Sequence, residues 1–256
     1  MAREQRRLLI PRPRLEAVAS DGLLQLEPQE GRYLTRVLRY GPGDRFALVD
    51  GLGCLWTAEL RGPVQARLLQ PLPQPQLQEP PPRPPLVLAA AVVKRDFELV
   101  VRMAVELGVD RLIPLLCDRT AVLGHPRPER WRTIAAEAAE QCERLWLSHI
   151  DEPLPLHQVL EDPQLRAGLR LWATTRRPQL PGLPALLEAQ SAAADGAAPV
   201  CLACGPEGGW SEAEEQLAER AGWRSVQLGP RILRSSTAAV AGLSVLSAWR
   251  QRVHRC

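Results

Sequence analysis

Residues 86–253 alternate between short apolar runs and segments with helical spacing, and this alternation constrains the fold more than any other feature of the sequence. Predicted strands cover Leu86–Val93, Val109–Leu116, Gly168–Thr174, Val200–Ala203 and Ser225–Leu228. Predicted helices cover Phe97–Leu107, Pro128–Trp146, Leu183–Gln190, Ser211–Gly222 and Thr237–Val253. Strands that alternate with helices form a parallel sheet covered on both faces. We therefore predict an α/β fold for this region.

A proline-rich segment separates this region from the N-terminal part of the chain. Residues 71–85 contain eight prolines, which can neither donate to a β-ladder nor continue a helix, so an extended linker is expected. Before it, two apolar runs flank the pair Asp50-Gly51, which is a strong hairpin signal, and Val64–Leu69 suits a further strand. The predicted domains are a small β-barrel over 1–72, a linker over 73–85 and an α/β domain over 86–256.

One segment of the predicted barrel domain has the pattern of a basic helix. Apolar side chains recur on one side at helical spacing, and arginines gather on the other. The apolar set is Tyr33, Leu34, Val37 and Leu38, and the basic set is Arg32, Arg36 and Arg39. The formal net charge of the whole chain is only +3, so this local excess permits nucleic-acid binding without establishing it.

Several classes of protein and of site are disfavoured. No apolar run approaches the roughly 20 residues that cross a bilayer, and the first residues lack the pattern of a secretory signal. Six scattered cysteines favour a reducing compartment such as the cytosol. Cys201 and Cys204 form a CxxC, but residues three apart in a strand point to opposite faces, so two small core residues are the better interpretation. No metal site is expected.

Two segments follow predicted strands at the end where open parallel sheets bind ligands. In Gly205–Gly209, three glycines and a proline leave backbone N–H groups accessible to a flat or anionic ligand, although a tight strand-to-helix turn explains the same residues. In Leu228–Thr237, Arg231 and Arg234 stand beside a helix N-terminus, a place that suits phosphate. Solvated arginines before a serine or threonine N-cap are the competing interpretation.

These segments, taken together, resemble the ribosomal RNA small subunit methyltransferase E (RsmE) family. The residues that carry the resemblance are Leu202–Glu214, Leu228–Arg234, Val105–Val109 with Asp118–Thr120, Glu137–Arg144, and Arg36–Arg39 with the Gly43-Asp44 turn. Several motifs in this order over nearly the whole chain are highly specific.

The resemblance implies a PUA-like RNA-binding barrel joined to a SPOUT methyltransferase domain that contains a deep trefoil knot and works as a homodimer. It also implies transfer of a methyl group from S-adenosylmethionine to N3 of a uridine in small-subunit (16S) ribosomal RNA, as free RNA or in the assembled subunit, in the cytoplasm. The cofactor-binding residues so implied are Ala173, Thr174, Gly205, Pro206, Glu207, Gly208, Gly209, Leu228, Gly229, Ile232 and Leu233. Arg234 is the catalytic candidate, and Arg36, Arg39, Arg119 and Arg144 are the RNA-binding candidates.

The chain departs from the family pattern at two positions. Ser236 stands where the family usually has glutamate, within Ser235-Ser236-Thr237-Ala238, and Tyr33 stands where many members have histidine. The first departure leaves two alternatives open. Beside the uridine N3-methyltransferase that the resemblance implies, these are a methyltransferase of another RNA position and an RNA-binding ribosome-assembly factor whose methyl-transfer site has degenerated.

Overall fold

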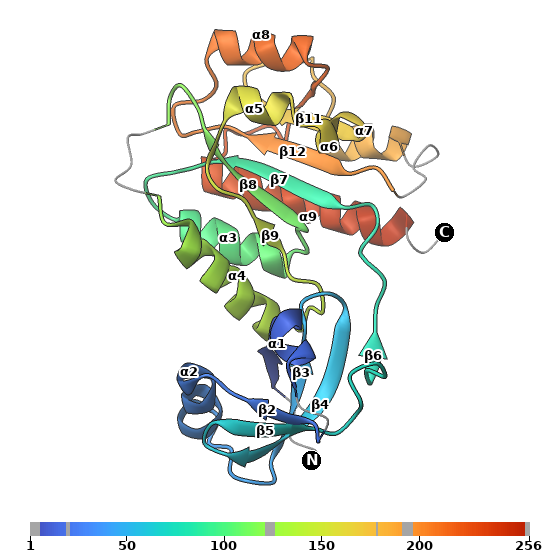
Figure 1. Cartoon of the computed structure of the whole chain (residues 1–256). Coiled ribbons are helices and arrows are strands. Elements are labelled where there is room, and N and C mark those ends of the chain that lie inside the picture. The colour runs from blue at the N-terminus through green and yellow to red at the C-terminus, as the bar shows by residue number, and fades with distance from the viewer. Residues whose placement is uncertain (1–5, 19–20, 121–125, 178, 191–196, 254–256) are drawn as a thin grey trace. The chain divides into compact units, whose positions relative to one another are not determined.

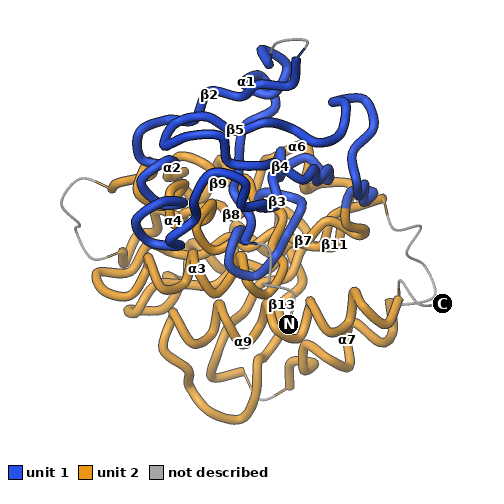
Figure 2. Tube along the Cα trace, turned by 90° about the horizontal axis from the view of Figure 1, so that it is seen from below, with its two compact units in different colours: residues 1–81, 139–147 blue, residues 82–138, 148–256 orange. Residues whose placement is uncertain are grey.

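The computed structural model describes residues 6–18, 21–120, 126–177, 179–190 and 197–253 (Figure 1). The chain divides into two compact units (Figure 2). Unit 1 contains residues 1–81 and 139–147, and unit 2 contains residues 82–138 and 148–256. No pattern in the sequence indicates that Ala139–Leu147 belongs with the N-terminal unit.

Unit 1 is built on a six-stranded sheet whose order is β1-β3-β4-β5-β2, with β6 paired to β4. The strands are β1 (Arg7–Leu9), β2 (Leu23–Gln25), β3 (Arg45–Val49), β4 (Cys54–Gly62), β5 (Gln65–Leu68) and β6 (Leu77–Gln78). The predicted hairpin around Asp50-Gly51 is formed by antiparallel β3 and β4, and Gly51 has a φ of +72°. Part of the predicted linker is a strand, β6, in which Leu77 pairs with Leu55 of β4.

The predicted basic helix of unit 1 is two short pieces. Helix α2 (Pro28–Arg32) passes into η1 (Tyr33–Val37), a π-helical turn in which the amide of Leu38 donates to the carbonyl of Tyr33 at 3.0 Å. This i to i+5 bond widens the turn and changes which side chains share a face. Val37 is therefore 66% exposed, and its predicted place on the apolar face is wrong.

The core of unit 1 lies between this sheet and its helices, which include α1 (Arg12–Glu16). Trp56, Phe46 and Leu48 from the hairpin are fully buried there, together with Leu15 of α1 and Leu34 of η1. Leu34 is the buried member of the predicted apolar set, and Tyr33 and Leu38 pack against the same core.

Unit 2 contains a parallel sheet, as the alternation predicts, but the sheet has seven strands where the sequence predicts five. Its order is β10-β8-β7-β12-β11-β13, with β9 paired to β8. The strands are β7 (Leu86–Ala91), β8 (Arg111–Leu116), β9 (His149–Ile150), β10 (Leu154–Pro155), β11 (Leu169–Ala173), β12 (Val200–Cys204) and β13 (Arg224–Val226). Every pair in this sheet is parallel.

Helices cover both faces of this sheet (Figure 1). On one face α9 (Ser235–Val253) packs against β7 and β12, with α3 (Phe97–Glu106) and α7 (Leu183–Gln190) beside it. On the other face lie α5 (Leu156–Leu160), α6 (Pro163–Arg166) and α8 (Glu212–Arg220). Helix α3 ends before Gly108, which has a φ of +89°, as its position after the apolar pattern predicts.

The helix that opens at Pro128 is shorter than predicted. Helix α4 (Pro128–Gln141) ends at Gln141, and Glu143 has a φ of +62°, a conformation that no helix interior accepts. The predicted continuation through Trp146 is therefore wrong. The indole N–H of Trp146 instead donates to the carbonyl of Glu79 at 3.1 Å within unit 1.

The CxxC cysteines lie in β12 and are fully buried. Cys201 packs with Trp172 in the cluster under α5 and α8, whereas Cys204 lies beside Ala239 of α9, so the two thiols do point to opposite faces of the sheet. Burial raises the pKa of Cys204 to about 12. Among the described residues, no group of three or more His, Cys, Asp or Glu side chains could hold a metal ion, and no helix of that part is long and apolar enough to cross a membrane.

Candidate active site

The candidate site is built on the carboxyl ends of three neighbouring strands in unit 2. Ala173 at the end of β11 is level with Cys204 at the end of β12 and with Val226 at the end of β13. The segments that follow these strands therefore start at one edge of the sheet. Together with Ala173 at the end of β11, they carry all of the predicted cofactor-binding residues: Thr174, Gly205, Pro206, Glu207, Gly208, Gly209, Leu228, Gly229, Ile232 and Leu233.

The segment after β11 is tied to its neighbours on both sides. The amide of Thr174 donates to the carbonyl of Val226 at 3.0 Å, and its hydroxyl donates to Glu215 of α8 at 2.7 Å. Further along, Gln227 donates to the carbonyl of Pro181 and accepts from the amide of Leu183. The chain after β11 and the chain after β13 thus run side by side.

Each glycine of the Gly205–Gly209 loop is required for a different structural reason. A Cβ atom at Gly205 would lie 2.8 Å from the indole of Trp210, and one at Gly208 would lie 3.1 Å from the Cβ of Arg119. Gly209 has a φ of +70° and open space around its missing side chain, and its amide closes a turn onto the carbonyl of Pro206. Two of the three glycines therefore admit the protein's own side chains, and only Gly209 faces open space.

Trp210 holds the glycine-rich loop against the end of β11. Its indole stacks on Trp172 with ring centroids 3.8 Å apart, and its N–H donates to the carbonyl of Ala173 at 2.8 Å. Trp210 is not among the site residues predicted from the sequence. Its position between the glycines and the capping box at Ser211 is the signal that could have found it.

Arg119 and Asp118, which follow β8, hold the other side of this loop. One guanidinium N–H group of Arg119 lies 3.1 Å from the carbonyl oxygens of both Gly208 and Trp210. Ser211 donates to the carboxylate of Asp118 at 2.6 Å, and the Asp118 amide donates to Glu214 at 2.9 Å. Arg119 is one of the predicted RNA-binding residues, and here its donor group is directed at the loop backbone.

The second loop leads from β13 into α9. Gly229 has a φ of +146° with nothing within 4 Å of its missing side chain, and Ile232 is 66% exposed. Arg234 is exposed and immediately precedes α9, where its carbonyl accepts the first helical hydrogen bond from Ala238 at 2.8 Å. Among the described residues, neither Arg234 nor Arg231 forms an ion pair, so both guanidinium groups are available to a ligand.

A narrow gap, too small to hold a water molecule, lies between the two loops and α3. It is lined by alanine and valine side chains of the β7 region and by Cys204, Gly205, Ser235, Ser236 and Ala239. Ser236, which replaces the carboxylate usual in the family, therefore borders a mostly apolar space in the first turn of α9. Gly242, one turn beyond Ala239, lets α9 approach β12 closely, because a Cβ atom at this position would lie 2.3 Å from the side chain of Leu202.

The remaining RNA-binding candidates belong to unit 1. Arg36 and Arg39 are exposed in and just after the π-helical turn, and Arg39 has a φ of +56°. Arg144 is half-buried in the 139–147 segment, where Arg7 pairs with Glu143 at 3.1 Å. The structure thus divides the predicted RNA-binding set between the units, with only Arg119 in unit 2.

Comparison with known proteins identifies both parts of the chain. Residues 79–247 match the model of the RNA methyltransferase domain family. Residues 26–69 match that of the RNA methyltransferase PUA domain. A ribosomal RNA small subunit methyltransferase E from Synechocystis is 39% identical over 220 residues, which cover 84% of this chain and 70% of that protein. The chain belongs to the ribosomal RNA small subunit methyltransferase E family.

Other members of the methyltransferase E family support this assignment. The protein of that name from Mycobacterium bovis is 28% identical over 89% of this chain and 87% of its own length. A crystal structure of the Neisseria gonorrhoeae protein bound to S-adenosylmethionine matches with a TM-score of 0.77 and 26% identity, over 96% of this chain and 98% of that one. The predicted combination of a PUA domain with a SPOUT methyltransferase domain is confirmed. The knotted path of the chain stays a prediction from the family.

Proposed function

We propose that this chain transfers a methyl group from S-adenosylmethionine to N3 of a uridine in small-subunit ribosomal RNA. The observation that carries the proposal is the convergence of three loops, after β11, β12 and β13, at one edge of a sheet in a chain of the methyltransferase E family. A related methyltransferase from Legionella pneumophila, 28% identical with a TM-score of 0.77, was solved with S-adenosylmethionine bound.

The loops fit a flat ligand held close to the backbone. Open space beside Gly209 and Gly229 leaves their backbone accessible, and the exposed side chain of Ile232 offers an apolar surface. We assign cofactor binding to Thr174, the Gly205–Gly209 loop and Leu228–Leu233. When bound, S-adenosylmethionine supplies a methyl group on a positively charged sulfur. The protein must mainly hold the acceptor within about 3–3.5 Å of that group and in line with it.

The acceptor chemistry gives Arg234 its role. Uridine N3 carries a weakly acidic imide proton, which must leave as the new carbon–nitrogen bond forms. A guanidinium group is a poor base, but it stabilises the negative charge that develops on the uracil ring. Arg234 is exposed at the start of α9 and has no ion pair among the described residues, so it can orient the uracil or its phosphate.

The partners follow from the same assignment. A PUA domain with exposed Arg36 and Arg39 is suited to ribosomal RNA, either free or in the assembled small subunit, and such a substrate places the protein in the cytoplasm. We include a homodimer in the proposal, as the resemblance to the family implies.

Two measurements test the function. Calorimetry with S-adenosylmethionine reports cofactor binding, and transfer of a labelled methyl group to small-subunit ribosomal RNA reports the reaction. We expect saturable binding and incorporation of label into the RNA. RNA binding without cofactor binding at millimolar concentration would favour the assembly-factor alternative that Ser236 raises. Label on a nucleoside other than uridine would favour another methyltransferase.

A further inference from the structure

A hollow in unit 2 lies away from the loops described above. It has a volume of about 510 Å³, within the range of small-molecule sites. Its lining comes from the ends of α5, α6 and α8 and from Arg170, the second residue of β11. It therefore lies toward the amino end of this strand, whereas the candidate methyl-transfer loops lie at the carboxyl end. We call this hollow the basic groove.

Positive charge predominates in the basic groove. Arg166, Arg170 and Arg220 line it together with His157, and Glu161 is the one carboxylate in the lining. Within the described part of the chain, none of the three arginines forms an ion pair. Arg166 and Arg220 stand in the last turns of α6 and α8, where a cation is favoured by the helix dipole. That preference accounts for their positions but leaves their guanidinium N–H groups available.

Arg170 is fixed in the lining of the groove by a hydrogen bond to the backbone. One terminal nitrogen of its guanidinium donates to the carbonyl of Ala221 at 2.8 Å, which fixes the side chain across the end of α8. Its Nε is buried and has no hydrogen-bond partner among the described residues. The hydrogen bond to Ala221 therefore holds the positive charge of Arg170 in the lining of the groove without neutralising it.

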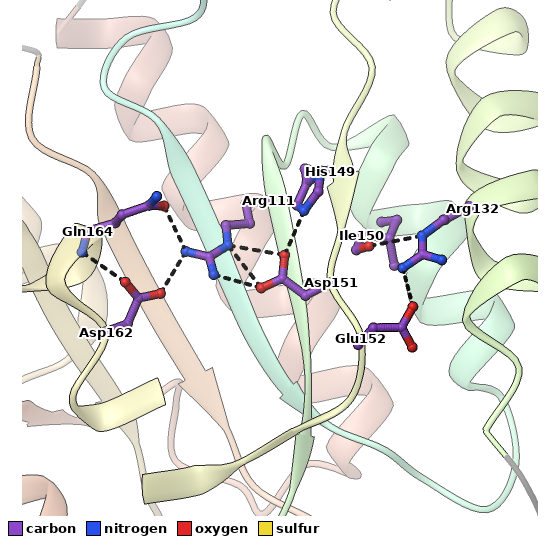
Figure 3. Close-up of polar contacts among 8 residues, drawn as sticks. All are labelled: Arg111, Arg132, His149, Ile150, Asp151, Glu152, Asp162 and Gln164. Carbon is purple, nitrogen blue, oxygen red and sulfur yellow. Dashed lines mark hydrogen bonds and ion pairs between the residues drawn. The ribbon is translucent and has the colours of Figure 1, made fainter. Parts of the chain in front are cut away.

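The helix that carries Arg166 is held by a separate ionic network (Figure 3). Arg111 of β8 donates to Asp162 at 2.8 Å and to Asp151 at 2.7 Å, and Asp162 caps the first turn of α6 through the amide of Gln164. Asp162 is thus neutralised by Arg111 and does not compete for the groove arginines. The same contacts keep α6 in place, so Arg166 is presented from an anchored element.

Apolar side chains complete the groove. Leu160 is buried beneath it, and Leu217 of α8 is 46% exposed at its edge. Cationic N–H groups beside an apolar surface match a phosphate joined to a ribose and a base. We propose that the basic groove binds a nucleotide through its phosphate group. The nucleotide can be free or part of an RNA chain, and the proposal goes beyond methyl transfer at the other end of the sheet.

The first test uses a free mononucleotide. Cytidine 5′-monophosphate contains neither the adenine of the proposed cofactor nor the uracil of the proposed acceptor, and cytidine serves as its phosphate-free control. Calorimetry at low salt should show binding of the monophosphate only. The double variant Arg166→Gln, Arg220→Gln should weaken it by about tenfold or more, as expected for two charge-assisted hydrogen bonds. Arg102→Gln, on α3 across the sheet, should leave it unchanged.

The second test uses single-stranded oligocytidylate. If the groove takes a phosphate of an RNA chain, the double variant should lower the slope of log affinity against log salt by about 0.7 for each phosphate that the protein no longer neutralises. An effect on the mononucleotide alone identifies a free nucleotide as the ligand, and an effect on the oligonucleotide alone identifies RNA. No change in either experiment overturns the proposal.

Two controls keep these outcomes separate from the proposed methyl transfer and from unfolding. Methyl transfer is assayed on the same preparations, so that active enzyme with unchanged nucleotide binding refutes the groove alone. Bound nucleotide with no methyl transfer refutes the enzymatic function alone. The thermal midpoint of the double variant should match that of Arg102→Gln. If it does not, Arg220→Gln by itself replaces the double variant, because Arg220 is exposed and has no hydrogen bond to the protein among the described residues.

Discussion

Arg119 donates from a single guanidinium nitrogen to the carbonyl of Gly208 across 89 residues of sequence, at 3.1 Å. Gly208 has no side chain at the point where the Arg119 Cβ approaches, and a Cβ atom there would lie 3.1 Å from it. The glycine-rich loop is therefore held by the protein itself before any ligand arrives, which is what a positioned cofactor loop needs.

The first prediction concerns this contact. Arg119→Gln removes hydrogen bonds from the charged group to two loop carbonyls, interactions worth roughly 1–3 kcal/mol together. We expect the affinity for S-adenosylmethionine, measured by calorimetry, to fall by about tenfold while the affinity for RNA changes little. Unchanged cofactor affinity with weakened RNA binding would return Arg119 to the RNA-binding role predicted from the sequence.

The second prediction concerns Gly205. Gly205→Ala places a methyl group 2.8 Å from the Trp210 indole, and overpacking of this kind costs about 1–3 kcal/mol. The free energy of unfolding should fall by that amount in urea titrations. Gly41→Ala is the matched control, since its Cβ meets nothing within 4 Å. Equal effects of the two substitutions would show that Trp210 does not restrict the loop.

The third prediction separates chemistry from cofactor binding. Arg234→Ala should leave the affinity for S-adenosylmethionine within about twofold and lower the rate of methyl transfer by about 100-fold or more, as loss of a charge-stabilising donor does. Single-turnover kinetics measure the rate, and Arg102→Gln is the control. The reverse pattern, weak cofactor binding with a normal rate, would make Arg234 a cofactor-binding residue.

The fourth prediction concerns the RNA-binding surface of unit 1. Reversing the charge of Arg36 or of Arg39, each singly, to Glu should weaken binding to small-subunit ribosomal RNA and make it less dependent on salt. Arg67→Glu, an exposed arginine of β5 in the same unit, makes the control for a change of charge alone. Equal losses in all three proteins would indicate a general charge effect and no specific contact.

The fifth prediction follows from the buried thiols. Burial raises the pKa of Cys204 to about 12, so the thiol is protonated at pH 8, and only the thiolate reacts with alkylating reagents. Peptide mass mapping should show slow alkylation of Cys204 in the folded protein and fast alkylation in urea. Fast labelling of the folded protein would contradict the burial of β12.

The sequence predicts the parts of the fold that repeat a simple pattern. Strands β7 and β12 of unit 2 are continuous apolar runs, and Gly108 ends α3 where the helical spacing ends, so these features could be found without a structure. Strands β9 and β10 have only two residues each and were not predicted. Strands β1, β2 and β6 have only two or three residues and are too short to show alternation. The end of α4 was missed because the left-handed conformation of Glu143 has no signal in its residue type.

The sequence likewise predicts some features of the candidate site and not others. The loops were found because they follow strands and contain glycine, and because their motifs resemble a known family. The hydrogen bond from Arg119 to the carbonyl of Trp210 could not be predicted, because it joins residues 91 positions apart in the sequence. The basic groove was also invisible in the sequence, since Arg166, Arg170 and Arg220 come together only when three helix ends and a strand meet.

Nucleoside mass spectrometry of small-subunit ribosomal RNA, after incubation with this protein and S-adenosylmethionine, tests the proposed methyl transfer most directly. We predict 3-methyluridine at one position, formed by the wild-type protein and lost with Arg234→Ala. Unmethylated RNA, or a methyl group on any other nucleoside, would contradict it.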